Sequence, residues 1–320
     1  MSQTLLIFGL GYSGRAIATA AVAAGFTVIA TSRNPAGQGV QPGVSVIAFD
    51  AAAPAIAAAT HIIATAAPDE NGDPVLARYA AQIAAAQNLR YIGYLSTTGV
   101  YGDAGGAWVD EDTPPNPQSP RAQRRAAAEQ AWSRLAPATP ASPVMPAPSV
   151  MPASPVMPAK AGIPAPSTPI TLDIFRLAGI YGPGRSMFDD LREGSARRVV
   201  KPGHLFGRIH RDDIASGVLK AMRRPAKPGV NIFNFSDDEP AASADVVVEA
   251  ARLLGVPPPA PVPFEQAAPK MTPMGLSFWA ENRRVSNKKT KAALQLEWLY
   301  PTYREGLAAI LAEERANARA

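Results

Sequence analysis

The chain contains no cysteine and only three histidines among its 320 residues. Without cysteine there can be no disulfide framework, no thiol nucleophile and no thiolate metal site. The three histidines, His61, His204 and His210, are spread over the chain, so a histidine-rich zinc site is not expected either. We therefore predict a protein without a metal centre.

Long apolar runs are missing as well. No stretch reaches the roughly 20 residues that a membrane-spanning helix needs. Residues 1–14 also lack the basic region and the small-residue cleavage site of a signal peptide. These absences predict a cytoplasmic protein that makes no contact with a membrane.

The excess of basic charge is small, with 31 lysines and arginines against 26 acidic residues and a formal charge of +5. The basic residues occur in scattered small groups, and no group is interleaved with aromatic residues as in RNA-binding proteins. We therefore expect no nucleic-acid partner. A modest positive charge fits a small anionic ligand at least as well.

One segment, residues 136–169, differs from the rest of the chain. It holds 11 of the 33 prolines, Lys160 as its single charge and no aromatic residue, and Met145, Met151 and Met157 mark a repeated short unit. Proline at this density removes backbone donors and forces extended conformations, which excludes helix and sheet. A Pro-rich docking motif is one interpretation; we favour a disordered, dispensable insertion. It separates residues 1–135 from residues 170–320.

Strands and helices alternate on both sides of this segment. Short apolar runs predict strands at residues 4–8, 27–30, 44–47, 61–65, 91–95, 171–175 and 230–234. Helices are predicted directly after the glycines at 9–14, over residues 75–86 and over residues 212–223. Asp73 is expected to cap the helix at 75–86. This alternation is typical of an α/β protein with a doubly wound parallel sheet. Residues 185–210 and 236–320 are left to form a smaller cap over the carboxyl edge of the sheet.

A glycine motif follows the first predicted strand and opens the first predicted helix. In Gly9-Leu-Gly11-Tyr12-Ser13-Gly14, the first glycine permits a tight turn, the second lets a pyrophosphate approach the backbone and the third allows close helix–strand packing. The amino end of the helix then offers oriented N–H groups to the anion. The motif predicts a dinucleotide-binding domain over residues 1–135.

The end of the second strand indicates which dinucleotide binds. NAD sites usually carry an acidic residue there, whereas this chain has Thr31-Ser32-Arg33. Arg33 offers a guanidinium group to a 2′-phosphate, and Ser32 can add a hydrogen bond, so NADP is favoured over NAD. We also assign Asp50, Thr65, Ala66 and Ser96, at the ends of later strands, to the cofactor site.

Four further stretches occur in the order typical of one family. They are residues 96–102 (STTGVYG), 175–185 (FRLAGIYGPGR), 208–215 (RIHRDDIA) and 234–237 (NFSD). With these four stretches and the glycine motif, the chain resembles an atypical branch of the extended short-chain dehydrogenases/reductases, the NAD(P)-dependent epimerase/dehydratase family. The resemblance covers nearly the whole chain except residues 136–169. It implies a Rossmann sheet with a smaller C-terminal substrate-binding cap, a nicotinamide cofactor and a carbonyl substrate.

The catalytic positions depart from the family pattern. The resemblance implies a serine or threonine that binds the substrate oxygen, a tyrosine that exchanges a proton and a lysine four residues later that lowers the pKa of that tyrosine. Thr97 takes the first position, but Arg121 and Arg125 stand where tyrosine and lysine are expected. Arginine stays protonated, so Arg121 cannot donate and recover a proton, whereas Arg125 can still bond the nicotinamide ribose. Tyr101 is a candidate replacement for the proton donor.

Three residues are assigned to substrate binding. Arg176 and Arg185 can hold a phosphate or a carboxylate, as can Arg211. His210 titrates near neutral pH and is, like Tyr181, an alternative proton donor; packing and helix capping are its other interpretation.

The sequence thus predicts an NADP-favouring oxidoreductase or epimerase that acts on a sugar-like or other carbonyl substrate, in which Arg121 and Arg125 replace the Tyr–Lys pair. The alternative is a protein that binds NADP without catalysis, as a sensor or an interaction partner. The resemblance also implies a homodimer formed through the helix that carries the catalytic positions.

Overall fold

The structure is a computed structural model that describes residues 3–39, 41–136 and 169–318. The predicted Pro-rich insertion at residues 136–169 lies outside the described residues except for its two ends.

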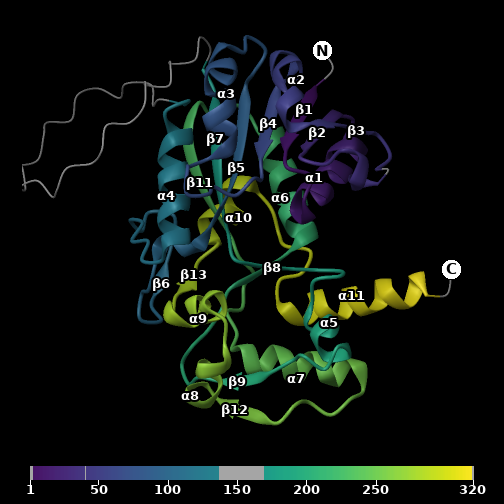
Figure 1. Cartoon of the computed structure of the whole chain (residues 1–320), viewed down its shortest axis with the longest axis vertical. Helices are drawn as coiled ribbons and strands as arrows, with labels where there is room; N and C mark the ends of the chain where they lie inside the picture. The colour runs from purple at the N-terminus through teal and green to yellow at the C-terminus, as the bar shows by residue number, and fades with distance from the viewer. Residues whose placement is uncertain (1–2, 40, 137–168, 319–320) are drawn as a thin grey trace, which may run out of the picture.

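A seven-stranded parallel sheet forms the centre of the molecule's larger part (Figure 1), in the order β11-β7-β5-β4-β1-β2-β3. Every neighbouring pair in it is parallel. Its strands are β1 (Thr4–Phe8), β2 (Thr27–Ser32), β3 (Val44–Ala48), β4 (His61–Ala64), β5 (Tyr91–Thr97), β7 (Thr171–Leu177) and β11 (Gly229–Phe235). The chain moves outward from β1 in one direction and then from β4 in the other, which confirms the doubly wound Rossmann sheet.

Helices cover both faces of the sheet. One face packs against α1 (Tyr12–Ala23), α6 (Arg211–Arg223) and α10 (Lys288–Leu294), and the other packs against α2 (Ala53–Ala58), α3 (Pro74–Ala85) and α4 (Pro120–Ser133). The strands are buried on both sides because they are continuous apolar runs, as in β1, where four of five residues are buried. The α10 helix had been expected in the cap, but Leu294 is buried in the core beneath the sheet.

Caps fix where the helices of the catalytic region begin. Asp73 accepts hydrogen bonds from the backbone N–H groups of Val75 (2.9 Å) and Leu76 (3.0 Å), which confirms its predicted capping role. The α4 helix begins after Ser119, whose hydroxyl accepts from the N–H of Ala122 at 3.3 Å. This start sets the positions of the arginines that α4 carries.

A smaller part lies beyond the carboxyl ends of the strands (Figure 1). It contains α5 (Met187–Arg192), β9 (Arg198–Val200), α7 (Ser243–Leu254), β12 (Pro261–Pro263), α8 (Phe264–Ala267), α9 (Pro273–Ala280) and α11 (Tyr303–Asn317). Helices α5, α7 and α11 share a core that includes Phe188, Ala250 and Ile310. Two short parallel ribbons link this part to the sheet: β8 (Gly179–Tyr181) with β10 (Arg208–His210), and β6 (Trp108–Val109) with β13 (Arg284–Val285). No helix in the described part of the chain combines the length and the apolar character that a bilayer crossing requires.

Because His61 is buried in the sheet, the pH dependence of the free energy of unfolding tests how the sheet packs around it. The imidazole ring is buried between Phe26 and Tyr91, with ring centroids 5.2 and 5.5 Å away, and burial lowers the pKa of His61 to about 4. The unfolded chain binds this proton near pH 6.5, so the unfolded state binds more protons than the folded state between these pH values. We expect the free energy of unfolding to fall from pH 6.5 to pH 4 by up to about 1.4 kcal/mol per pH unit from this group.

The measurement is urea unfolding of the wild type and of His61→Phe across this pH range. The variant should lose stability less steeply with acid than the wild type does. His210, whose pKa burial also lowers to about 4, leaves a residual slope in both proteins. Equal slopes for the two proteins would contradict the burial of a neutral His61.

Candidate functional site

The turn between β1 and α1 has a geometry that only glycine permits. Gly9 has φ +102°, and a Cβ atom there would lie 2.6 Å from Thr65 Oγ1. A Cβ atom at Gly14 would lie 2.2 Å from the carbonyl oxygen of Gly9, well inside contact distance. The first and third glycines of the motif therefore bring helix and strand together, as the sequence predicts.

Gly11 meets a different environment. A Cβ atom there would have no neighbour within 4 Å, and Gly11 is the N-cap of α1 with no side chain bonded to the first turn. That turn also lacks acidic residues. The backbone N–H groups at the start of α1 are thus left to an external acceptor, with room beside Gly11 for it to approach.

Neighbouring hydroxyl groups hold this turn in place. Thr65 donates to the carbonyl oxygen of Gly9 at 2.8 Å, and Thr31 accepts from its N–H at 3.3 Å. Thr65, assigned to the cofactor, thus also supports the turn. Ala66, next in the chain, is half-buried, and its carbonyl oxygen lies 3.5 Å from Arg125 Nη1.

The end of β2 presents one free guanidinium group. Arg33 is exposed and forms no ion pair within the described residues. The Ser32 hydroxyl accepts from the N–H of Asn34 (3.1 Å) and from Gln38 Nε2 (2.9 Å), so only its proton remains for a ligand. Asp50 is exposed, with its nearest cation, Arg78, at 3.9 Å.

Ser96, assigned to the cofactor, and Arg176, assigned to the substrate, both belong to a buried hydrogen-bond network. Ser96 donates to Glu129 Oε1 at 2.5 Å, and Arg176 donates to both carboxylate oxygens of Glu129, at 3.2 and 2.8 Å. Arg176 is 2% exposed. The expectation that Arg176 binds substrate is therefore wrong, because the side chain is buried and the Glu129 carboxylate neutralises its charge. The Ser96 hydroxyl is likewise committed within the protein rather than facing a cofactor.

Tyr101 belongs to the same network. Its hydroxyl donates to Asn234 Oδ1 at 2.8 Å, and the guanidinium of Arg176 lies over its ring, 4.7 Å from the centroid. Burial raises the pKa of Tyr101. A buried phenol whose proton is already donated does not exchange protons with a substrate, so the proposed role of proton donor does not fit this placement.

Thr97 keeps the proton that catalysis needs. Its hydroxyl oxygen accepts from the N–H of Gly99 at 3.1 Å and caps the short helix η3 (Thr98–Tyr101), while the side chain remains partly exposed. A hydroxyl that accepts in this way still has its O–H to donate. Thr97 can therefore bind a substrate oxygen, as the sequence predicts.

Arg125, at the lysine position, is anchored to the sheet. Its Nη1 donates to the carbonyl oxygen of Leu95 at 2.8 Å and to the Tyr94 hydroxyl at 3.0 Å. Strand β5, which Arg125 contacts through Leu95 and Tyr94, ends at Thr97. Arg125 thus has a fixed position next to the predicted reaction site.

Arg121, at the tyrosine position, lies one turn earlier on α4 and is exposed. It forms no ion pair with any carboxylate in the described ranges. The pKa of Arg121 is lowered by partial burial and then by the positive charges of Arg125 and Arg185. Arg121 thus feels the positive charge of two further guanidinium groups and has no ion-pair partner among the described residues, which favours a bound anion.

Arg185 and Arg211 both lie close to the tyrosine of the glycine motif. Their guanidinium carbons are 5.7 and 5.3 Å from the centroid of the Tyr12 ring, and the Tyr12 hydroxyl donates to the carbonyl oxygen of Pro183 at 3.0 Å. Arg185 is exposed, whereas Arg211 pairs with Asp212 at 3.1 Å. The structure thus brings Arg185, from the second half of the chain, to the glycine turn.

His210 is almost fully buried, with 2% of its surface exposed. It is buried between Tyr181 and Tyr300, its Nδ1 accepts from the N–H of Asp212 at 3.2 Å as the cap of α6, and burial lowers its pKa to about 4. This burial does not fit the predicted role of His210 in substrate binding, and the contacts that it makes are those of packing and capping. Tyr181 is buried beside it, with its pKa raised by burial.

Arg283 is a site residue that the sequence did not reveal. A methyl group added at Gly99 would lie 3.4 Å from Thr97 Oγ1 and 3.8 Å from Arg283 Nη2, so these two donors border one small space. Arg283 Nη1 is held by the carbonyl oxygen of Gly102 (2.8 Å) and by Glu281 (2.6 Å). Arg283 lies in a stretch without a recognisable motif, more than 180 residues from Thr97, so only the fold brings the two together. No group of three or more metal-ligating side chains occurs among the described residues.

Comparisons with known proteins agree with this architecture. No protein-family profile matches the chain. A curated relative, the 3-diazoavenalumate denitrifying reductase of a Streptomyces species, is 27% identical over 143 residues, which are 42% of this chain and 45% of that protein. The match spans less than half the length of that relative.

Solved structures match over nearly the full length. A conserved protein of unknown function from Silicibacter pomeroyi is 40% identical, with a TM-score of 0.79 over 98% of this chain and 99% of that one. MoeE5 in complex with UDP-glucuronic acid and NAD is 18% identical (TM-score 0.71, 98% and 99% covered). The human epimerase family protein SDR39U1 with NADPH is 17% identical (TM-score 0.69, 96% and 99% covered).

The identity to the Silicibacter protein is high enough to establish kinship, and the more distant structures share the arrangement of the sheet. The chain belongs to the same family as the Silicibacter pomeroyi protein, and its fold is that of the NAD-dependent epimerases and dehydratases.

Proposed function

We propose that the chain is an NADP(H)-dependent oxidoreductase or epimerase that acts on a small carbonyl or sugar-like substrate bearing an acidic group. The observation that carries this proposal is the glycine turn, which packs tightly at Gly9 and Gly14 but leaves open space and free N–H groups at Gly11. Structures with the same fold hold NAD or NADPH, and the curated relative is named as a reductase.

The exposed arginines support the finer parts of the proposal. Arg33 is a free cation at the end of β2, where a 2′-phosphate is recognised in this fold. Arg121 and Arg185 have no carboxylate partner within the described ranges, so a substrate phosphate or carboxylate is their natural counter-charge.

The chemistry follows from the donors around Thr97. A bound nicotinamide supplies or accepts the hydride. Thr97 donates its hydroxyl proton in a hydrogen bond to the substrate oxygen, and the arginines stabilise negative charge that develops there. Arg121 stays protonated, so the proton that finally reaches this oxygen comes from solvent rather than from the side chain at the tyrosine position.

A protein that binds NADP without catalysis is the second candidate, favoured by the loss of the Tyr–Lys pair. That function has Arg121 filling the reaction space or pairing with an acid. Arg121 is instead exposed and has no acidic partner among the described residues, which supports the enzyme.

Gly11→Val tests the dinucleotide site. The added side chain meets no protein atom near its Cβ, so the fold should lose at most about 1 kcal/mol, yet it fills the space beside the start of α1. We expect NADPH affinity, measured by calorimetry, to fall by about 100-fold or more at nearly unchanged melting temperature. Gly14→Val should instead lower the melting temperature, because its Cβ collides with the carbonyl oxygen of Gly9. Unchanged NADPH binding in Gly11→Val would exclude this turn as the site.

Arg33→Glu tests the choice of dinucleotide. Removing a charged hydrogen bond to the 2′-phosphate should weaken NADPH binding by roughly 1.5–3 kcal/mol, with little effect on NADH. Arg315→Glu, at the exposed end of α11, makes the same change of net charge and should leave both affinities unaltered. Equal losses for NADPH and NADH in Arg33→Glu would defeat the assignment.

Arg121→Ala tests catalysis. NADPH oxidation is followed with a panel of small keto acids and phosphorylated sugars, with Arg124→Ala, the exposed neighbour on α4, as the control. We expect turnover by the wild type and a loss of about 100-fold in kcat/KM for Arg121→Ala. Tight NADPH binding without oxidation by any compound would favour the non-catalytic function.

A further inference from the structure

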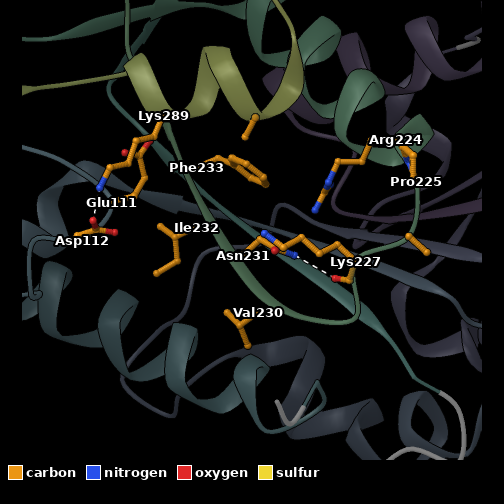
Figure 2. A pocket seen from close by; sticks show the side chains of 12 residues that line it. Glu111, Asp112, Arg224, Pro225, Lys227, Val230, Asn231, Ile232, Phe233 and Lys289 are labelled. Atoms are coloured by element: carbon orange, nitrogen blue, oxygen red, sulfur yellow. Dashed lines mark hydrogen bonds and ion pairs between the residues drawn. The ribbon is translucent and has the colours of Figure 1, made fainter. Parts of the chain in front are cut away.

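The β11 strand ends the sheet, and its free edge borders a surface cavity of about 710 Å³. Figure 2 shows the strand crossing this cavity, with Arg224 and Lys227 near its beginning and with Glu111, Asp112 and Lys289 near its end. The lining residues used below are Glu111, Asp112, Lys227, Val230, Ile232 and Lys289. None of them belongs to the site at the glycine turn.

The backbone groups of β11 point alternately toward β7 and toward the open side. The N–H of Gly229 donates to the carbonyl oxygen of Ile170, at the start of β7, so the odd-numbered residues of β11 face β7. Since successive residues alternate, Val230, Ile232 and Asn234 direct their N–H and C=O groups to the open side. The N–H of Asn234 donates to Thr290 Oγ1 at 2.8 Å. Within the described residues, no hydrogen bond satisfies the backbone groups of Val230 or Ile232 on this side.

The strand also lacks the usual protection of an edge. Its sequence, Gly-Val-Asn-Ile-Phe-Asn-Phe, contains no charge and no proline, and Val230 is 39% exposed. Natural proteins normally blunt an open edge with charged residues, proline or a bulge, because such an edge pairs with another strand. The open edge of β11 is thus suited to accept a strand.

The charges at the two ends of this edge are opposite. Lys227, exposed just before β11, is basic. At the far end, Asp110, Glu111 and Asp112 share one nearby cation, Lys289, which pairs with the first and the third. Opposite charges at the two ends of one edge match a second copy placed antiparallel, because each basic end then meets an acidic end.

We propose that β11 forms a two-fold homodimer interface, in which the free edges of two copies pair as antiparallel strands. Val230 then lies opposite Ile232 of the partner subunit, each pair exchanging both backbone hydrogen bonds, and Lys227 approaches the acidic end of the partner. The sheets of the two subunits become continuous. This inference is independent of the proposed function.

The strands alone are too short for a stable contact, since specific interfaces bury roughly 1,600 Å² in total. The surfaces that flank the edge must therefore take part: the acidic loop, the segment from Arg224 to Lys227 and helix α10. They already border the same cavity as β11. The helix-pair dimer that the family resemblance implies would instead use α4, on a different side of the sheet, so the two arrangements are separable.

Sedimentation of the full chain over a range of concentrations tests the proposal. We expect a dimer for the wild type and a dissociation constant raised by about tenfold or more for Val230→Lys, which places a charge against the partner strand. Val230 is exposed, so the variant should keep its melting temperature. Val256→Lys is the matched control, because Val256 is 43% exposed and lies elsewhere, after α7; it should dimerise as the wild type does.

Charge reversal tests the antiparallel arrangement. Lys227→Glu and Asp112→Lys should each weaken the dimer, and the two together should restore it, since opposite charges then meet again. A monomeric wild type, or a dimer that Val230→Lys leaves intact, would overturn the proposal. Loss of the dimer in Val230→Lys without recovery in the charge-reversed double variant would overturn the antiparallel two-fold pairing.

Discussion

The close approach of Gly14 to the carbonyl oxygen of Gly9, which a Cβ atom at Gly14 would meet at 2.2 Å, is the constraint on which the rest of the structure depends. At this separation no side chain fits, so α1 lies directly against the end of β1. Thr65, from the end of β4, fixes the same turn through the carbonyl oxygen of Gly9. With α1 packed this closely, the N–H groups at its start lie beside the open space at Gly11, where an anion can approach them.

Arginines that stabilise the fold differ from those assigned to ligands in whether a carboxylate of the protein neutralises them. Two arginines packed against the sheet are neutralised by acids: Arg176 by Glu129, and Arg224 by the fully buried Asp173. A buried charge without a partner would cost several kcal/mol, so these pairs hold the sheet together rather than serve a ligand. The exposed arginines at the carboxyl edge, Arg121 among them, have no carboxylate partner within the described residues. An anionic cofactor and an acidic substrate supply the negative charge that these arginines lack.

The sequence predicted features that local patterns determine and missed those that depend on the register of distant segments. Apolar runs placed every strand of the sheet within a residue of its start, and the glycine spacing located the turn. The role of Arg176 was missed because β5 and β7 pair Ser96 with Arg176, which lets Glu129 reach both. Arg283 was missed because only the folding of the C-terminal part brings it to Thr97.

The central claim is that the glycine turn holds NADPH with its nicotinamide beside Thr97, and that Arg121 borders the reaction space without filling it. A crystal structure of the chain with NADPH tests this most directly. The account predicts the diphosphate beside Gly11, the 2′-phosphate at Arg33 and an open volume over the nicotinamide, bordered by Thr97. An empty turn at saturating NADPH, or an Arg121 side chain that fills the volume over the nicotinamide, would contradict it.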